Sequence, residues 1–191
     1  NRISLGVQSF DDKELKALGR AHSADDVIGA LKMLKASGLE NSSIDLIYGI
    51  PGQTIDGWED TLKKAVEYMP EHISAYELTP EKGTALYGSL RKGETVLPDE
   101  DLTADMFDCA VDALTKAGFG HYEISNYARP GRQCRHNMNY WERGEYLGLG
   151  AGAHSFSGEK RWSNTRDIAE YIKSLRRGVI PVVESEDISM E

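Results

Sequence analysis

Cysteine is scarce in this sequence, and so is any long apolar run. Cys109 and Cys134 are the only cysteines among 191 residues, which excludes the dense disulfide framework of small secreted domains and favours a reducing, cytoplasmic compartment. No segment approaches the roughly 18 consecutive apolar residues that a membrane-spanning helix needs. Positive charge is also in deficit, with 22 Lys and Arg against 31 Asp and Glu. This balance excludes a broad nucleic-acid-binding surface.

Strand-like and helix-like segments alternate along the chain. Short apolar segments predict strands, and amphipathic segments with capping residues predict helices between them. The predicted strands cover residues 2–10, 43–50, 72–79 and 119–128, and the predicted helices cover 23–38, 58–69 and 99–118. This order is typical of an α/β domain with a parallel sheet and outer helices.

Polar residues occupy alternate positions of the predicted strands. Because successive side chains of a strand point to opposite faces, Gln8, Asp45, Glu77 and Thr79 are expected to line one polar cavity. The alternative is that these residues face solvent at a sheet edge. In parallel α/β folds, ligands bind beyond the carboxyl ends of the strands, and Arg20 could reach an anionic group there as a planar fork.

The segment "RHNMNYW", at residues 135–141, sets a His, two Asn, a Tyr and a Trp just ahead of the glycine-rich "GLGAGAHSF". One interpretation is a packed connection in which the aromatic rings enter the core. The other is a wall that receives a flat ligand. Three nearby cations, Arg129, Arg132 and Arg135, form either a solvated loop or an anion site. The glycines favour close approach of the backbone to a ligand.

Three motifs together carry a resemblance: "LGVQSF", "IDLIYGIPGQT" and "YEISNYARPGRQCRHNMNYWERGEYLGLGAGAHSF". In this order and spacing they are similar to the oxygen-independent coproporphyrinogen III oxidase family of radical S-adenosylmethionine (radical SAM) proteins, and most of all to its haem-chaperone branch. The resemblance implies the second half of a partial (β/α)6 barrel in residues 1–128. It implies a haem-chaperone-type segment, with the start of a further region, in residues 129–191.

The resemblance also implies binding residues for S-adenosylmethionine. Gln8 and Asp45 are expected to hydrogen-bond the ribose region, and Arg20 is expected to pair with the methionine carboxylate. Thr79 and His154 match positions that contact the adenine end through backbone atoms.

Haem is the second ligand that the resemblance implies, at His136, Asn137, Tyr140 and Trp141. His136 would be the iron ligand, the aromatic rings would offer flat faces to the porphyrin, and the three arginines would meet its propionates. The alternative for His136 is a hydrogen-bonded residue that fixes the loop. Cys134 is either a soft ligand or an incidental buried thiol.

The sequence departs from the family at its iron–sulfur cluster. The family holds a [4Fe-4S] cluster with three cysteines spaced C-x3-C-x2-C, which Cys109 and Cys134 do not match. We expect that Asn1 follows the half of the barrel that carries them. The leading hypothesis is a haem chaperone that transfers haem to an acceptor protein. The alternatives are a coproporphyrinogen III dehydrogenase, which oxidatively decarboxylates a porphyrinogen, and an unrelated barrel enzyme for a small phosphorylated metabolite.

Overall fold

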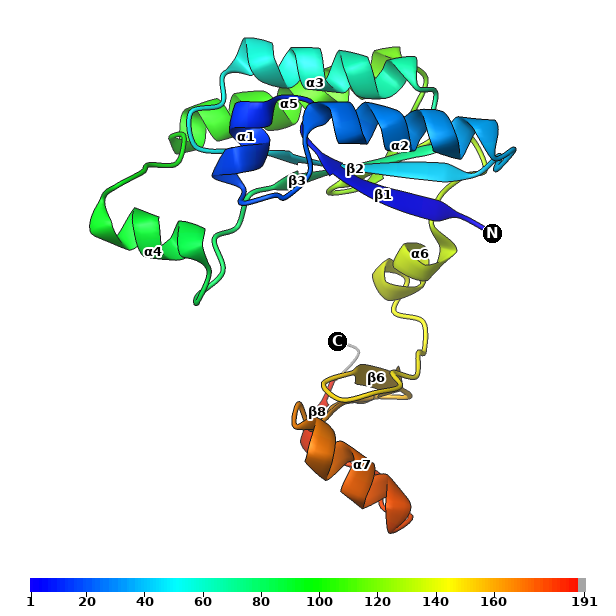
Figure 1. Ribbon diagram of the computed structural model, residues 1–191. Coiled ribbons are helices and arrows are strands. Elements are labelled where there is room, and N and C mark those ends of the chain that lie inside the picture. The colour runs from blue at the N-terminus through cyan, green and yellow to red at the C-terminus, as the bar shows by residue number, and fades with distance from the viewer. Residues whose placement is uncertain (189–191) are drawn as a thin grey trace. The chain divides into compact units, whose positions relative to one another are not determined.

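The chain divides into two compact units, Asn1–Gln133 (unit 1) and Cys134–Glu191 (unit 2). The computed structural model in Figure 1 describes residues 1–188. Within these residues, no helix is long and apolar enough to span a bilayer. The elements of unit 1 are β1 (Ile3–Gln8), α1 (Asp12–Ala17), α2 (Ala24–Ala36), β2 (Ser42–Tyr48), α3 (Ile55–Glu67), β3 (His72–Glu77), α4 (Ala85–Lys92), α5 (Glu100–Lys116), β4 (Gly120–Glu123) and β5 (Asn126–Ala128).

A five-stranded sheet in the order β1-β2-β3-β5-β4 forms the centre of unit 1. β1, β2 and β3 are parallel neighbours, so the predicted α/β class and its parallel strands are confirmed for this part of the chain. Figure 1 shows α2, α3 and α5 on the same side of these strands. One face of the sheet is therefore covered by helices, and Asp45 and Ser74 lie on the other face.

The last part of the sheet is antiparallel, which corrects the prediction of one more parallel strand at 119–128. Residues 124 and 125 form a turn, and β5 pairs antiparallel with both β4 and β3. β4 runs in the same direction as β3, as a crossover through α5 requires. After the two-residue turn, β5 runs in the opposite direction and lies between β3 and β4.

The predicted helices form where their capping residues stand. Ser23 caps α2 in a reciprocal capping box with Asp26, and Gly38 follows the helix with a φ of +73°. Asp99 accepts a hydrogen bond from the Leu102 backbone N–H at the start of α5. These caps satisfy backbone groups that each helix end leaves without a partner, and so fix where the helices begin and end.

Gly29 lies in the middle of α2, and a Cβ added there would meet nothing within 4 Å. Because glycine loses more backbone entropy than alanine in a helix, Gly29→Ala is expected to raise the free energy of unfolding by about 0.5–1 kcal/mol. Urea denaturation checks this. Gly38→Ala is the matched control, since its positive φ should make the same substitution destabilising. A loss of stability in Gly29→Ala would contradict the prediction.

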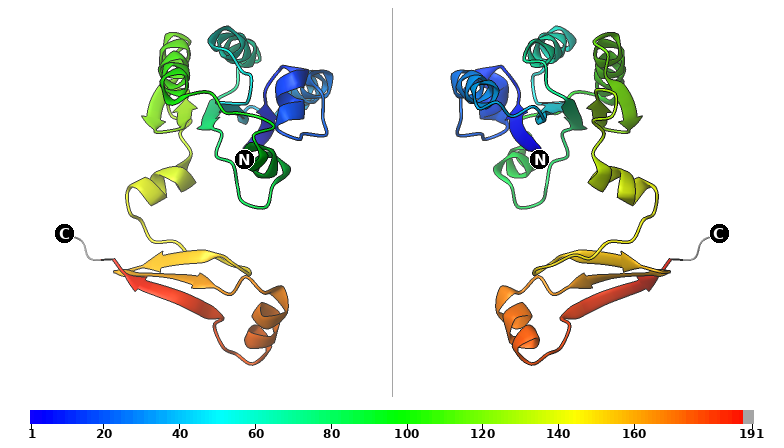
Figure 2. Two further views of the ribbon diagram at one scale, coloured as in Figure 1. Left: turned by 90° about the vertical axis from the view of Figure 1, so that its left-hand side faces the viewer. Right: turned by 90° about the vertical axis from the view of Figure 1, so that its right-hand side faces the viewer.

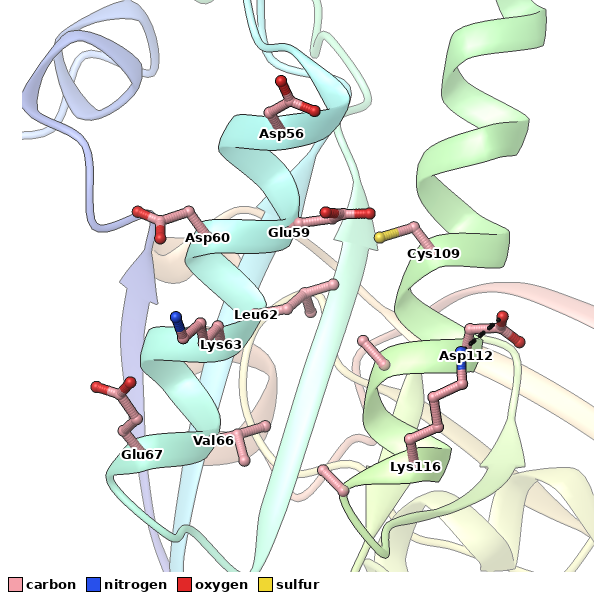
Figure 3. A pocket seen from close by; sticks show the side chains of 12 residues that line it. Asp56, Glu59, Asp60, Leu62, Lys63, Val66, Glu67, Cys109, Asp112 and Lys116 are labelled. Atoms are coloured by element: carbon pink, nitrogen blue, oxygen red, sulfur yellow. Dashed lines mark hydrogen bonds and ion pairs between the residues drawn. The ribbon is translucent and has the colours of Figure 1, made fainter.

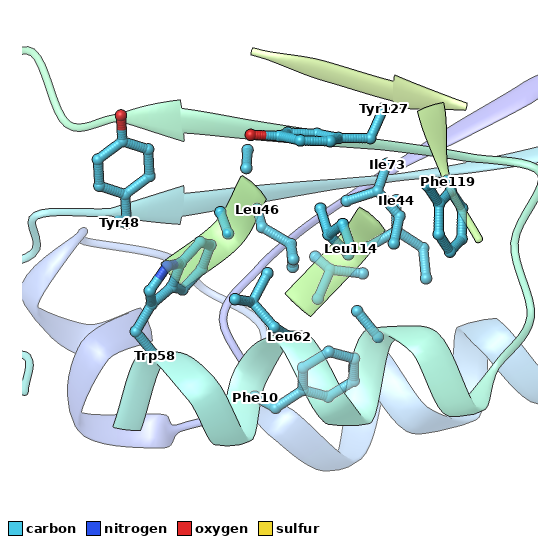
Figure 4. Close-up of a cluster of buried hydrophobic side chains, with 14 of the residues drawn as sticks. Phe10, Ile44, Leu46, Tyr48, Trp58, Leu62, Ile73, Leu114, Phe119 and Tyr127 are labelled. Atoms are coloured by element: carbon cyan, nitrogen blue, oxygen red, sulfur yellow. The ribbon is translucent and has the colours of Figure 1, made fainter. Parts of the chain in front are cut away.

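The hydrophobic core lies between the strands and the helices of unit 1. Figure 4 shows strand residues such as Ile44, Leu46 and Ile73 facing Leu62 of α3 and Leu114 of α5. All of these side chains are buried. The core occupies the helix-covered face of the sheet, so it anchors the strands whose other face carries the polar residues.

Unit 2 combines one short helix with a separate small sheet. Its elements are α6 (Arg135–Trp141), β6 (His154–Ser157), β7 (Lys160–Asn164), α7 (Ile168–Arg176) and β8 (Val182–Asp187). The three strands form an antiparallel sheet in the order β6-β7-β8, seen from two sides in Figure 2. The buried Asn164 of β7 donates hydrogen bonds to the carbonyls of Gly148 and Gly150 at 3.4 and 3.0 Å. These bonds tie the glycine-rich segment to the sheet.

Candidate functional site

The polar face of the parallel strands carries Asp45. The strand register sets Asp45 beside Gly6 of β1 and Ser74 of β3. Both carboxylate oxygens of Asp45 accept from the Ser4 hydroxyl, at 2.9 and 2.8 Å. Small neighbours leave the carboxylate half-buried rather than enclosed. It keeps lone pairs with which to accept hydrogen bonds from hydroxyl groups.

Gln8 and Arg20 meet at the carboxyl end of β1. Gln8 stands at an irregularity in the pairing with β2 and has a φ of 68°, which is uncommon for a residue with a side chain. Its Oε1 accepts from Arg20 Nη2 at 3.2 Å. A side chain at Gly6 would lie 2.8 Å from Gln8 Nε2. The absence of a side chain at Gly6 therefore allows the Gln8 amide to lie close to the backbone, on the face of the sheet that carries Asp45.

A buried network supports the loop that holds Gln8. Ser9 Oγ donates to Glu14 Oε2 at 2.5 Å, and Gln53 Nε2 donates to the same oxygen at 3.0 Å. Burial raises the pKa of the Glu14 carboxyl, and the two hydrogen bonds act against this rise. The network links the loop after β1 to the loop after β2. It holds together the carboxyl ends of β1, which carries Gln8, and β2, which carries Asp45.

The predicted grouping of Asp45 with Glu77 on one face of the sheet is wrong. The register pairs Tyr48 with Glu77, which sets Glu77 on the helix-covered face, opposite to the face of Asp45 and Ser74. Burial raises the pKa of Tyr48 to about 12, and the neighbouring Glu77 adds to this. Thr79 is exposed beyond the end of β3. Of the residues predicted for S-adenosylmethionine, Gln8, Arg20 and Asp45 lie at this face of unit 1.

The motif at 135–141 forms helix α6, and its helical periodicity divides the four predicted haem residues. His136 and Tyr140 are four residues apart and share one face, with ring centroids 4.8 Å apart edge to face. Asn137 and Trp141 form the next pair around the helix. A cavity of about 810 Å³ in unit 2 is lined by His136 and Tyr140, and not by Asn137 or Trp141. The cavity therefore brings together two of the four predicted haem residues.

Aromatic rings continue across this cavity. Tyr140 and Tyr146 meet edge to face at 4.5 Å between centroids, and Tyr146 and Phe156 are tilted at 6.2 Å. Tyr146 and Phe156 exchange backbone hydrogen bonds as an isolated antiparallel pair. The complete lining is His136, Tyr140, Arg143, Gly144, Tyr146, Leu147, Gly148, Leu149, Ala153, His154, Phe156, Arg161 and Ile188. Its volume falls in the range of about 300–1,000 Å³ typical of small-molecule sites.

The cationic residues of the cavity are not the predicted ones. Arg143 and Arg161 line it, and Arg161 Nη1 lies 3.3 Å from Glu186 Oε1. Arg129 instead donates from Nη1 to the Ala117 carbonyl at 2.7 Å and covers the Phe119 ring at 4.1 Å. It neutralises the C-terminal end of α5. Arg129 is not among the residues that line the cavity, and its propionate role stays a prediction.

The remaining residues of the basic run are also placed by the structure. The Arg132 carbonyl accepts from the Arg2 guanidinium in unit 1. Arg135 is exposed on α6 and is not part of the cavity lining, and Cys134 is the N-cap residue of that helix. Within residues 1–188, no group of three or more His, Cys, Asp and Glu could hold a metal ion.

The glycine-rich segment packs against protein backbone, a placement that the prediction of a close approach to a ligand did not include. A Cβ at Gly148 would lie 2.0 Å from the carbonyl oxygen of His154. Glycine is therefore required there for residues 146–148 to approach β6. The same approach brings His154 to the cavity with His136.

Sequence reasoning missed Tyr146, Phe156, Arg143 and Arg161 as lining residues. The signal for two of them was in the sequence: Tyr146 and Phe156 are aromatic residues on either side of the glycine run, as expected for partners across a chain reversal. Arg143 and Arg161 gave no such signal, because their positions depend on how unit 2 folds.

A second cavity, of about 920 Å³, lies between α3 and α5 in unit 1. Figure 3 shows Leu62 and Val66 of α3 opposite Cys109 of α5, with Glu59 near the thiol. Burial raises the pKa of the Cys109 thiol, and the charges of Glu59 and Asp112 add to this. The lining contains neither a histidine nor an aromatic ring. It does not have the side chains that a porphyrin would need.

The comparisons with known proteins agree on one family. The model of the radical SAM superfamily matches residues 1–65. The chain is 41% identical over 174 residues to the heme chaperone HemW of Lactococcus lactis, covering 91% of this chain and 46% of that protein. It is 46% identical over 154 residues to HemW of Escherichia coli, covering 81% and 40%. It is 43% identical over 154 residues to the mitochondrial radical S-adenosyl methionine domain-containing protein 1 of Mus musculus, covering 81% and 35%.

The fold has a counterpart among solved structures. The coproporphyrinogen III oxidase HemN from Escherichia coli, a radical SAM enzyme, matches 99% of this chain with a TM-score of 0.78, at 22% identity and over 46% of its own length. The chain spans half or less of the length of the curated relatives reported above. Fold, motifs and relatives together place it: the chain belongs to the radical SAM superfamily, in the haem-chaperone (HemW) branch of its coproporphyrinogen III oxidase-like family.

Proposed function

We propose that this chain is the haem-binding part of a haem chaperone, and that haem is its cargo, to be passed to an acceptor protein in the cytoplasm. The observation that carries the proposal is the cavity of unit 2, which joins two histidines, a series of aromatic rings and two arginines. The proteins similar to this chain include heme chaperones by name.

Each part of the cavity suits one part of haem. A neutral imidazole such as His136 can ligate haem iron. Tyr140, Tyr146 and Phe156 offer apolar faces to the macrocycle. Arg143 and Arg161 are planar donors for the propionate carboxylates. The arginines differ from those the sequence suggested, but the chemistry is the same.

S-adenosylmethionine is the second ligand that we propose, at the polar face of unit 1. Asp45 fits as an acceptor for ribose hydroxyls. Arg20 fits as a partner for the methionine carboxylate, provided that its guanidinium gives up the hydrogen bond to Gln8 and donates to the ligand instead. For Thr79, the contact with the adenine end stays a prediction. When bound with a reduced [4Fe-4S] cluster, S-adenosylmethionine supplies a radical in this family. The chain's two cysteines do not suffice to ligate a cluster, so no radical step is assigned to it.

The wider architecture follows the same proposal. We assign residues 1–128 to the second half of a partial (β/α)6 barrel and residues 129–191 to the haem-binding segment and the start of a further region. For Asn137 and Trp141, which do not line the cavity, contact with haem stays a prediction. The alternative function, oxidative decarboxylation of coproporphyrinogen III, rests on likeness of fold to HemN. Product analysis with the whole protein separates the two, because a chaperone forms no protoporphyrinogen.

Titration of the chain with haemin, followed by visible absorption, tests the proposed function. We expect a saturable Soret shift that His136→Ala weakens at least about tenfold, the cost typical of a lost contact near a metal. His121→Ala is the matched control, because His121 lies on β4 in unit 1. Circular dichroism establishes that each variant is folded. A folded chain that shows no saturable shift would refute haem binding by this cavity.

A further inference from the structure

The five histidines of the chain differ in what their ring nitrogens contact. The rings of His22 and His121 each reach a backbone carbonyl through Nε2, at 3.4 and 3.1 Å. His72 uses both nitrogens, with Nδ1 2.8 Å from Ser43 Oγ and Nε2 2.7 Å from the Tyr122 hydroxyl. These three residues have structural hydrogen bonds that fix their rings.

His136 and His154 are the other two. Within residues 1–188, neither ring forms a hydrogen bond or an ion pair, and both rings line the cavity of unit 2. A neutral imidazole always has one nitrogen with an available lone pair. The cavity therefore collects the two histidines whose ring nitrogens the protein does not use.

The backbone of His154 is held firmly although its ring is not. In β6 it pairs with Ser163 of β7. Continuing the antiparallel Tyr146–Phe156 pair by two residues sets Gly148 opposite His154, and a Cβ at Gly148 would lie 2.0 Å from the His154 carbonyl oxygen. Phe156, two residues along the strand, shares the face of His154 and lines the same cavity.

We propose that His154 is a second ligand to the haem iron, so that His136 and His154 hold the haem from its two faces. This rests on the proposed haem function and deepens it. The two imidazoles come from different elements, α6 and β6, and a segment containing Gly144, Gly148, Gly150 and Gly152 joins them. The inference gives His154 a role other than the adenine contact that the family resemblance implies.

The spin state of the bound iron tests this directly. Two axial imidazoles give low-spin ferric haem, whereas one imidazole gives a high-spin form. We therefore expect electron paramagnetic resonance of the haemin complex to show a low-spin signal for the unchanged chain and for His121→Ala. His154→Ala should be high-spin and should bind haemin about tenfold more weakly. Added imidazole should restore its low-spin signal by filling the axial position that His154 leaves open.

The outcomes separate this inference from the proposed function. If the chain binds haemin, His136→Ala weakens it and His154→Ala stays low-spin, His154 is not a ligand and the haem function stands. If the folded chain does not bind haemin, the proposed function is wrong, and the inference about His154 fails with it. If circular dichroism shows that His154→Ala is unfolded, the same-sized polar variant His154→Gln replaces it. A low-spin His154→Gln complex would overturn the assignment, and a high-spin one would support it.

Discussion

Replacing Trp58 with alanine is expected to lower the free energy of unfolding of unit 1 by about 3–5 kcal/mol, the usual cost of truncating a buried tryptophan. The Trp58 side chain is fully buried in α3 and packs against Tyr48 at 5.5 Å between ring centroids. Its Nε1 donates to the Met106 carbonyl of α5 at 2.8 Å. Figure 4 shows the indole between the helix layer and the strands. Its loss removes contacts with α5 and β2 together.

Urea denaturation followed by far-ultraviolet circular dichroism measures this change. Trp58→Phe keeps most of the ring and gives up the hydrogen bond to Met106, so a smaller loss of about 1 kcal/mol is expected. Trp141→Ala is the matched control, because that indole is 54% exposed on α6 and its removal should change stability by about 0.5 kcal/mol or less. Equal stabilities for Trp58→Ala and Trp141→Ala would contradict this account of the core.

The helices could be predicted from the sequence because their signals are local. Ser23 and Asp26 are three residues apart in the chain, and their reciprocal hydrogen bonds form within the first turn of α2. Asp99 acts on Leu102 in the same way. Neither contact depends on the rest of the fold, so the boundaries of α2 and α5 were predictable to within a few residues.

The polar face could be predicted strand by strand but not between strands. Alternation gives the two faces of β2 and the two faces of β3, but it does not say which face of one strand joins which face of the next. Only the register sets Asp45 beside Ser74 and Tyr48 beside Glu77. Gln8 was even less predictable, because its positive φ arises from the irregular pairing at the end of β1.

The candidate haem site shows the same division between local and distant contacts. The motif at 135–141 identified His136 and Tyr140, and a helical interpretation of it would have separated them from Asn137 and Trp141. His154 lies on β6 and reaches the cavity through the close approach at Gly148. A contact between backbone segments leaves no pattern in the sequence beyond the glycine itself.

Acidification from pH 7 to about 4 is expected to cost unit 1 about 3 kcal/mol through His72 alone. Burial lowers the pKa of His72 from 6.5 to about 4, and the charge of Arg2 adds to this. The folded state thus favours the neutral ring, whereas the unfolded chain binds a proton below pH 6.5. The stabilisation is complete above that value and is lost as the pH falls towards 4.

Urea denaturation at pH 7, 5.5 and 4, followed by the fluorescence of Trp58, the one tryptophan of unit 1, measures this loss. His72→Gln keeps an amide near the Ser43 and Tyr122 hydroxyls but cannot take up the proton, so its stability should fall by about 3 kcal/mol less over the same interval. His121→Gln, at an exposed position of β4, should keep the full dependence. Parallel curves for the unchanged chain and His72→Gln would show that His72 is protonated without cost in the folded state.

His72 lies on the same face of the sheet as Ser74 and Asp45. Its protonation would place a positive charge on the face that we assign to S-adenosylmethionine, so binding of that ligand should weaken over the same pH interval.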